Sequence, residues 1–299
     1  MDIAVYIDDY NKITQCELPY DPQNELIKSK YGELYKEIGK YVEYKTPNRL
    51  YFGAEFCQKL IPSVYDCEKA YIYAQKHNMK FSYVTPGLFD NALLKTEDSL
   101  KLLNDYNDYI EVVCNDWGMV QLIKNKYSNL KPVLGRMIDK LSREPRLSNE
   151  QFKDIYGEEG IRFLKTPNIF VKEYQEIIDL YNIEMVELDC VPQGLNLNNN
   201  INFKYKIGIH VPFYYITTGV ICMLQIMNSD EHDKYNFSNS CMRSCKNIDI
   251  IMKKSDSIYD NNLCMELIRK GNTVYNSIRN LNDYLDNMYS IERLILQYF

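Results

Sequence analysis

The stretch Leu50-Tyr51-Phe52-Gly53-Ala54-Glu55-Phe56-Cys57 contains a short apolar run, a glycine turn and a cysteine. Short apolar and aromatic runs that end at turn residues are typical of buried β-strands. Comparable runs recur along the chain at residues 3–7, 81–84, 110–113, 133–134, 185–188 and 204–209. We therefore expect Cys57 to lie just beyond the carboxyl end of a strand.

Amphipathic stretches typical of helices alternate with these runs, at residues 25–41, 63–76, 97–105, 119–126 and 171–181. Such alternation predicts a parallel sheet with right-handed crossover helices. About seven or eight strand–helix units in a chain of 299 residues favour a TIM-like α/β barrel, complete, incomplete or distorted, over an open sheet. No linker rich in Pro, Gly or Ser divides the chain, so residues 1–299 are predicted to form a single barrel domain.

The charge pattern argues against two classes of partner. The formal net charge is −6 and the basic residues are dispersed, whereas nucleic-acid binding favours a concentrated basic stripe. No run of about 18 apolar residues is present, so we expect no membrane insertion. The amino-terminal residues lack the basic start and long apolar stretch of a signal peptide, which predicts a cytoplasmic protein.

The nine cysteines are then better interpreted as thiols or metal ligands than as disulfides. Cys222, Cys241 and Cys245 form a C-x18-C-x3-C pattern within a late segment at about residues 219–247. Iron–sulfur clusters need several thiolates at fixed distances, whereas structural zinc sites favour close cysteine pairs at both ends. Buried, inert thiols are the alternative.

Spacing alone does not identify a fourth ligand. Cys57 has its place after a strand in its favour, but Cys114 and Cys190 occupy comparable strand ends. Cys16, Cys67 and Cys264 are also available. At this point the choice stays open.

Three further side chains are candidates for catalysis: His210, Asp116 and Glu187. His210 ends a predicted strand and could act as an acid, a base or a hydrogen-bond donor, or simply hold a loop. Asp116 could pair with Glu111 for acid–base chemistry, or could cap the helix that begins near it. Glu187 shares one strand face with Asp189, and such a pair facing inward would be costly without hydrogen bonds.

Two more groups have a structural and a functional interpretation. The segment Arg143-Glu144-Pro145-Arg146 reads as an exposed loop, although its arginines could hold an anionic substrate. Tyr214 and Tyr215 could line a pocket, but packing in the core is the commoner fate of such residues.

Five segments in this order carry a resemblance to a known family: residues 50–57, Val112-Val113-Cys114-Asn115-Asp116-Trp117-Gly118, Leu134-Gly135-Arg136 with residues 143–146, Val186-Glu187-Leu188-Asp189 before Pro192-Gln193-Gly194, and Thr217-Thr218-Gly219-Val220-Ile221-Cys222 ahead of Cys241 and Cys245. The chain resembles the collagenase-like peptidase family U thirty-two, particularly its short UbiU- and UbiV-like members. This resemblance implies a barrel and, as in UbiV-like members, a 4Fe–4S cluster on Cys57, Cys222, Cys241 and Cys245, with zinc as the alternative. The chain departs from the family in a longer gap between Cys222 and Cys241, and in Val220-Ile221 where an Arg is common.

The resemblance implies an iron–sulfur protein in oxygen-independent redox modification of the hydroxylation type, acting on a small molecule, an RNA base or a peptide. One alternative is a peptidase-like hydrolase with structural cysteines, although the chain has no H-E-x-x-H, G-x-S-x-G or phosphate-binding loop. Another is a non-catalytic subunit that delivers substrate or electrons. That alternative implies a hetero-oligomer with a related barrel protein.

Overall fold

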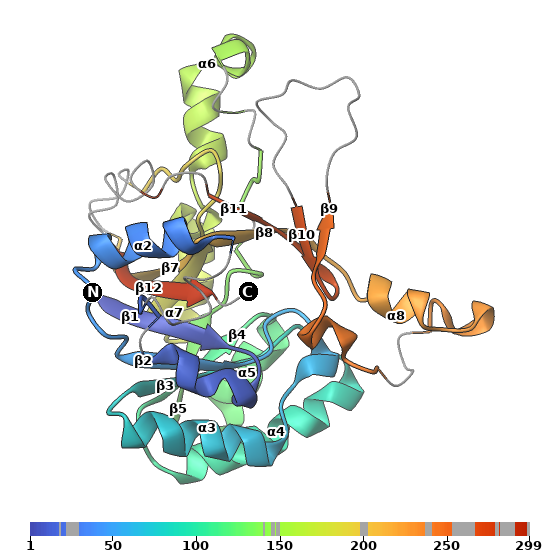
Figure 1. Cartoon of the computed structure of the whole chain (residues 1–299). Helices are drawn as coiled ribbons and strands as arrows, with labels where there is room; N and C mark the ends of the chain where they lie inside the picture. The colour runs from blue at the N-terminus through green and yellow to red at the C-terminus, as the bar shows by residue number, and fades with distance from the viewer. Residues whose placement is uncertain are drawn as a thin grey trace.

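A computed structural model describes residues 1–17, 19–21, 30–139, 141–144, 147, 150–197, 203–236, 241–252, 267–278, 281 and 291–297. Within them, eight parallel strands close into a barrel in the order β1-β12-β7-β6-β5-β4-β3-β2 (Figure 1). Their bounds are β1 (Asp2–Ile7), β2 (Arg49–Gly53), β3 (Lys80–Val84), β4 (Ile110–Cys114), β5 (Leu130–Leu134), β6 (Met185–Asp189), β7 (Lys206–Val211) and β12 (Ile291–Gln297). The predicted TIM-like barrel is confirmed, and it is closed.

Alternation along β2 shows how the sequence specifies the two sides of the barrel wall. Leu50 and Phe52 pack in the large apolar layer between the barrel and its helices, and Tyr51 points into the barrel interior. Gly53 ends the strand with φ +143°, and a Cβ there would lie 2.1 Å from the carbonyl oxygen of Val84. Only glycine fits this close approach, so the turn that leads to Cys57 depends on it.

Helices cover the outside of the barrel. They are α2 (Gly32–Tyr41), α3 (Val64–Lys76), α4 (Asp90–Asp105), α5 (Trp117–Lys126) and α7 (Lys172–Leu180), whereas α6 (Glu150–Lys165) projects away from the barrel (Figure 1). Four of the predicted helical stretches are present; α4 begins earlier than expected, and α6 was not predicted. The fifth, at residues 25–41, lies partly outside the described residues, and its described part is α2.

A second sheet is inserted between β7 and β12, and the sequence did not predict it. It is antiparallel, in the order β8 (Phe213–Thr218), β11 (Thr273–Ser277), β10 (Leu267–Lys270) and β9 (Ile250–Met252). The short helix α8 (Met223–Met227) and the 3-10 turn η6 (Ser244–Lys246) belong to this insertion, residues 213–277. Figure 1 shows it beyond the end of the barrel that lies away from the N-terminus. The late cysteine segment therefore lies beside the carboxyl ends of the barrel strands, here called the mouth.

Candidate functional site: a cysteine centre at the barrel mouth

Cys57 follows β2 by a loop that several contacts hold in place. The Tyr6 hydroxyl donates to the carbonyl oxygen of Gly53 at 3.2 Å and accepts from the backbone N–H of Glu55 at 3.2 Å. Cys57 then precedes the 3-10 turn η2 (Gln58–Leu60) and is partly buried. The strand end therefore delivers this thiol to the mouth, as the sequence predicted.

The three late cysteines lie in the insertion. Cys222 precedes α8, and Cys245 is within η6. Both are buried in a small apolar cluster with Leu224, against which Leu60 packs. Because Leu60 belongs to the loop that carries Cys57, this cluster joins the early and the late cysteine segments.

The four thiols, called the cysteine centre below, are close enough to affect one another. Burial raises the pKa of Cys57, and the nearby thiols of Cys241 and Cys222 raise it further. Burial also raises the pKa of Cys245 to about 12, with added effects from Cys57, Cys222 and Cys241. Thiolates gathered in this way repel one another unless a cation binds among them.

The donor set fits a soft metal. Four sulfur ligands suit an iron–sulfur cluster or zinc, both of which take up to four cysteine thiolates. In the described part of the chain, no three His, Cys, Asp or Glu side chains stand close enough together to hold a metal ion. Metal binding at the cysteine centre would therefore require its side chains to close in, which is common because metal binding and folding are coupled.

The other described cysteines lie apart from this centre. Cys16, Cys67, Cys114 and Cys190 are buried, and burial is the main cause that raises the pKa of each, to about 12 for Cys16 and Cys67. None of these four has Cys57, Cys222, Cys241 or Cys245 among the groups that shift its pKa. Of the three strand-end cysteines, Cys57 therefore belongs to the cysteine centre, and Cys114 and Cys190 do not. Cys264 lies outside the described residues.

A small pocket of about 40 Å³ opens at the mouth next to Cys57. Its lining combines aromatic, charged and amide side chains: Tyr6, Asp8, Glu55, Phe56, Cys57, Lys270, Asn272, Tyr275 and Gln297 are among them. A second pocket of similar volume is lined by Cys222, Cys241 and Cys245. Cys57 is therefore the member of the cysteine centre that also faces the mouth pocket.

Buried ion pairs form the floor of the mouth. Arg136 makes a bidentate pair with Glu55, with Nε–Oε1 at 2.6 Å and Nη2–Oε2 at 2.8 Å, and its Nη1 donates to Asp189 at 2.6 Å. Arg143 donates to the other oxygen of Asp189 at 2.7 Å and lies 3.8 Å from the centre of the Tyr215 ring. The carboxylates hold the pKa of Arg136 well above its usual value, against the opposing effect of burial.

Two predicted catalytic residues meet inside the barrel. His210 Nε2 lies 2.9 Å from Glu187 Oε2, and both side chains are buried. His210 Nδ1 has no hydrogen-bond partner within the described residues. Glu187 and Asp189 share one face of β6, as predicted. That face points inward, and the two carboxylates bind different partners, His210 and Tyr51 for Glu187 and two arginines for Asp189. A histidine oriented by a carboxylate, with its second nitrogen free, is suited to proton transfer.

Asp116 does not join this pair. Its carboxylate accepts from the backbone N–H of Met119 at 2.7 Å as the N-cap of α5, and from that of Leu88 at 3.2 Å. No hydrogen bond or ion pair links it to His210 or Glu187 in the part of the chain that is described. Glu111, the other half of the carboxylate pair considered from sequence, begins β4 at the opposite end of the barrel. The capping interpretation therefore accounts for Asp116.

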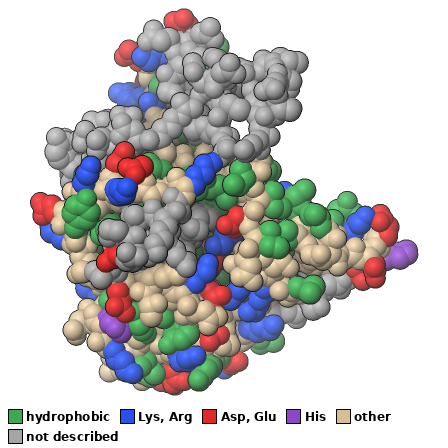
Figure 2. All heavy atoms as spheres, in the orientation of Figure 1, with side chains coloured by type: hydrophobic (Ala, Val, Ile, Leu, Met, Phe, Trp, Pro, Cys, Tyr) green, Lys and Arg blue, Asp and Glu red, His purple; other side chains and the backbone are tan. Residues whose placement is uncertain are grey.

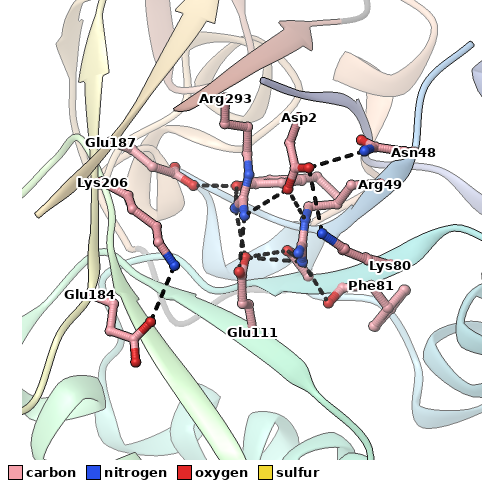
Figure 3. Close-up of polar contacts among 12 residues, drawn as sticks. Asp2, Asn48, Arg49, Lys80, Phe81, Glu111, Glu184, Glu187, Lys206 and Arg293 are labelled. Carbon is pink, nitrogen blue, oxygen red and sulfur yellow. Dashed lines mark hydrogen bonds and ion pairs between the residues drawn. The ribbon is translucent and has the colours of Figure 1, made fainter. Parts of the chain in front are cut away.

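The amino ends of the barrel strands, here called the base, carry a separate network (Figure 3). Arg293 forms a bidentate pair with Glu111 at 2.6 and 3.0 Å, and Arg49 approaches Glu111 at 3.1 Å and Asp2 at 3.7 Å. The Tyr51 hydroxyl donates to Glu187 at 2.7 Å and accepts from Arg293 at 2.7 Å, which connects the base to the His210 pair.

The base also holds a pocket of about 690 Å³, far larger than the two pockets of about 40 Å³ beside the cysteines. Its charged lining consists of Asp2, Arg49, Lys80, Asp108, Glu111, Lys131, Glu184, Lys206, Glu292 and Arg293. Those ten side chains comprise five cations and five carboxylates, so their formal charges cancel. Catalytic groups of TIM-like barrels lie at the carboxyl end, and the base contributes stability. We therefore place the candidate site at the mouth despite the larger pocket.

No protein family model, curated protein or solved structure matches the chain. No helix in the described ranges is long and apolar enough to cross a membrane.

Sequence reasoning missed the partners of Arg136 and the connection through Tyr51. The one available signal was that Arg136 and Asp189 each follow or end a predicted strand, because residues at strand ends meet at the mouth.

Proposed function

We propose that this chain is an iron–sulfur protein that takes part in oxygen-independent redox modification of a substrate at the barrel mouth. The observation that carries the proposal is the position of Cys57, which belongs to the cysteine centre and also lines the mouth pocket. A substrate in that pocket would lie beside the metal. The resemblance to the U thirty-two family points the same way and stays a prediction.

Cys57, Cys222, Cys241 and Cys245 would hold the cluster, which supplies one-electron transfer when bound. A hydroxylation that takes its oxygen atom from water turns a C–H bond into C–OH and releases two protons and two electrons. It therefore needs a soluble or protein electron acceptor from outside this chain. His210 Nδ1 is a suitable acceptor for a proton, since Glu187 holds the other ring nitrogen.

The mouth offers fixed polar groups for binding a substrate. Glu55 lines the mouth pocket and is held by its ion pair with Arg136, and Arg136 is held in turn by Asp189. Phe56 packs between Tyr215 and Tyr275, with ring centres at 5.0 and 5.6 Å, which keeps the aromatic wall in place. A preorganised site of this kind lowers the entropy lost when a substrate binds.

A cytoplasmic location belongs to the same proposal, because reduced thiols are the form that binds iron and sulfide. Pairing with a second barrel protein is a further part of it. The insertion exposes large apolar side chains near the cysteine centre, including Met227 at 70% and Met242 at 84% exposure. Figure 2 shows hydrophobic side chains gathered on the part of the surface that projects to the right. Copurification with a second cysteine-bearing barrel, and inactivity alone, would support the subunit alternative.

The hydrolase alternative has less support. No hydrogen bond joins His210 to a Ser, Thr or Cys side chain within the described residues, so the histidine has no evident nucleophile to activate. Peptide turnover by metal-free protein that is lost in His210→Ala would favour the hydrolase.

The test is metal content after purification without oxygen. We expect about four irons with matching acid-labile sulfide per chain, lost in Cys57→Ala, Cys222→Ala, Cys241→Ala and Cys245→Ala. Cys190→Ala is the matched control, because this buried thiol also lies at a strand end but outside the cysteine centre. Zinc in place of iron would mean that the metal site exists but has no redox function. The absence of any metal would refute the proposal.

A further inference from the structure

The turn between β10 and β11, residues Lys270-Gly271-Asn272-Thr273, contacts several of the cysteine-bearing segments at once. Lys270 and Thr273 pair across the hairpin, and Gly271 takes a left-handed conformation with φ +61°. None of these four residues is a predicted ligand or catalytic group. Their contacts nevertheless converge on the cysteine centre.

Asn272 joins the loop of Cys57 to the loop of Cys222. Its Nδ2 donates to the carbonyl oxygen of Phe56 at 3.0 Å and to that of Gly219 at 2.6 Å. The backbone N–H of Gly219 returns a hydrogen bond to the Asn272 carbonyl at 3.2 Å. Phe56 immediately precedes Cys57, and Gly219 lies three residues before Cys222, so one buried amide fixes both segments.

The orientation of this amide is itself held. The Thr273 hydroxyl donates to Asn272 Oδ1 at 3.2 Å, which leaves Nδ2 directed at the two carbonyls. Asn272 is 6% exposed, and so its hydrogen bonds are shielded from competition by water. Loss of the donor would leave two carbonyl oxygens of the cysteine loops without this partner.

Gly271 brings the same turn against the segment that carries Cys245. A Cβ at this position would lie 3.3 Å from Cys245 Sγ and 3.4 Å from Cys245 Cβ. The backbone of the turn therefore packs directly on the Cys245 side chain. Any larger residue would have to displace either the turn or that thiol.

Two ion pairs tie the turn and the Cys245 segment to the end of β1. Lys270 Nζ lies 3.6 Å from Asp8 Oδ2, and Lys246 Nζ lies 2.9 Å from Asp9 Oδ2. Lys246 follows Cys245 directly, and Asp8 and Asp9 follow β1 at the mouth. The insertion is thus anchored to the barrel beside Cys57.

We propose that the Lys270–Thr273 turn assembles the cysteine centre, with Asn272 as its positioning residue and Gly271 as the packing surface for Cys245. The inference rests on the proposed function for its metal, but it concerns contacts that exist without one. Asn272 also lines the mouth pocket, but its side-chain nitrogen is committed to the two loop carbonyls. It acts by holding the loops of Cys57 and Cys222 at a fixed separation.

The first test needs no metal. Reduced protein is treated with iodoacetamide, and the alkylation rate of each cysteine is followed by mass spectrometry. We expect Asn272→Leu, which has nearly the same shape but no donor, to speed labelling of buried Cys222 by about tenfold or more through local opening. Asn276→Leu, at a buried asparagine further along β11 whose side chain has no hydrogen bond to the cysteine loops among the described residues, is the control. Equal rates in parent and Asn272→Leu would overturn the proposal.

The second test measures cobalt(II) affinity from the thiolate charge-transfer absorption. Loss of a residue that orients ligands typically weakens metal binding by about 10–100-fold, and we expect that range for Asn272→Leu and for Asn272→Asp. Asn272→Asp removes the donor and adds a charge, so similar losses in both variants would assign the effect to the donor. Full affinity in both would overturn the positioning role.

Gly271→Ala has a control in Gly157→Ala. Both glycines have a positive φ, at +61° and +64°, so alanine strains the backbone at both, and Gly157, with ψ 172°, lies in a region that is open essentially to glycine alone. A Cβ meets Cys245 only at position 271, and has nothing within 4 Å at position 157. We expect weakened cobalt binding in Gly271→Ala alone. If the parent binds neither cobalt nor iron while Asn272→Leu still exposes Cys222, the proposed function fails and the role of the turn stands.

Discussion

The two ends of the barrel are both polar, but they satisfy their polar groups in different ways. At the base, Arg49 and Arg293 neutralise Asp2 and Glu111 through direct ion pairs. These arginines and nearby hydrogen bonds keep the pKa of Glu111 below its usual value even though burial alone would raise it. At the mouth, Arg136 also pairs with Glu55 and Asp189, but burial raises the pKa of Cys57 and of Cys245, and the neighbouring thiols add to it.

This difference separates a structural site from a candidate functional one. The larger pocket lies at the base, where the charges cancel, whereas the mouth pocket is small and lies beside Cys57 of the cysteine centre. Buried groups that satisfy one another need nothing from outside. Groups that destabilise one another when ionised are stabilised by a bound metal. We therefore expect the functional site to lie at the mouth.

The largest expected effect is at the base. Arg293→Met leaves Glu111 and the Tyr51 hydroxyl without their shared partner in a buried environment. Removing one member of a buried pair typically costs about 3–5 kcal/mol, and we expect that loss in the free energy of unfolding by urea. The double variant Arg293→Met/Glu111→Gln should recover part of the loss, because no buried charge is then left unpaired.

The same variant tests the comparison itself. Folded Arg293→Met should bind iron as the parent does, because the base is remote from the cysteine centre. Loss of iron with normal stability would place the base within the functional site and break the distinction between the two ends.

The next effect depends on pH and concerns the mouth. Burial raises the pKa of Asp139 to about 7, and Asp189 adds to this, while Arg143 opposes it. Because the folded pKa exceeds the unfolded value, the stability held by the neutral carboxyl is complete below about pH 4 and is lost as pH rises to about 7. The size is at most about 4 kcal/mol at 1.36 kcal/mol per pKa unit.

Asp139→Asn should therefore flatten the fall in unfolding free energy between pH 4 and 8. Urea titrations at several pH values would measure this, with Asp98→Asn, an exposed carboxyl, as the control that keeps the parent profile. An unchanged profile in Asp139→Asn would mean that this carboxyl is already ionised at pH 4.

A smaller effect is expected at Tyr51, where the ion-pair network of the base meets the Glu187–His210 pair. Tyr51→Phe removes the hydroxyl that links Glu187 to Arg293, and an unsatisfied buried partner costs about 1–3 kcal/mol. In the Arg293→Met background the same change should cost less, since one of its two partners is already gone. Additive losses in the double variant would show that the hydroxyl acts on Glu187 alone.

The sequence predicted local features well and non-local partners poorly. Seven barrel strands and the strand-end position of Cys57 follow from apolar runs and turns close in the chain. The closing strand β12 was missed because the insertion separates it from β7, and its pairing with β1 joins the two ends of the chain. The antiparallel sheet and the Asn272 contacts were missed for the same reason, since periodicity within one segment does not identify its partner in space.

Asp116 shows that the sequence could state both alternatives without choosing between them. The residue follows a predicted strand and precedes a predicted helix, and either a catalytic acid or an N-cap fits that position. Only the hydrogen bond to the Met119 N–H separates the two.

The smallest expected effect is at Asp116, and it decides between the N-cap and the acid–base group. Asp116→Ala should lower the free energy of unfolding by about 1 kcal/mol, the usual cost of a lost N-cap, as should Ser63→Ala at the start of α3. Asp116→Asn should restore most of the loss, because asparagine caps a helix as well as aspartate but cannot exchange a proton. If Asp116→Asn instead folds normally and abolishes turnover, Asp116 is an acid–base group after all, and the functional site extends from the cysteine centre to the β4–α5 loop.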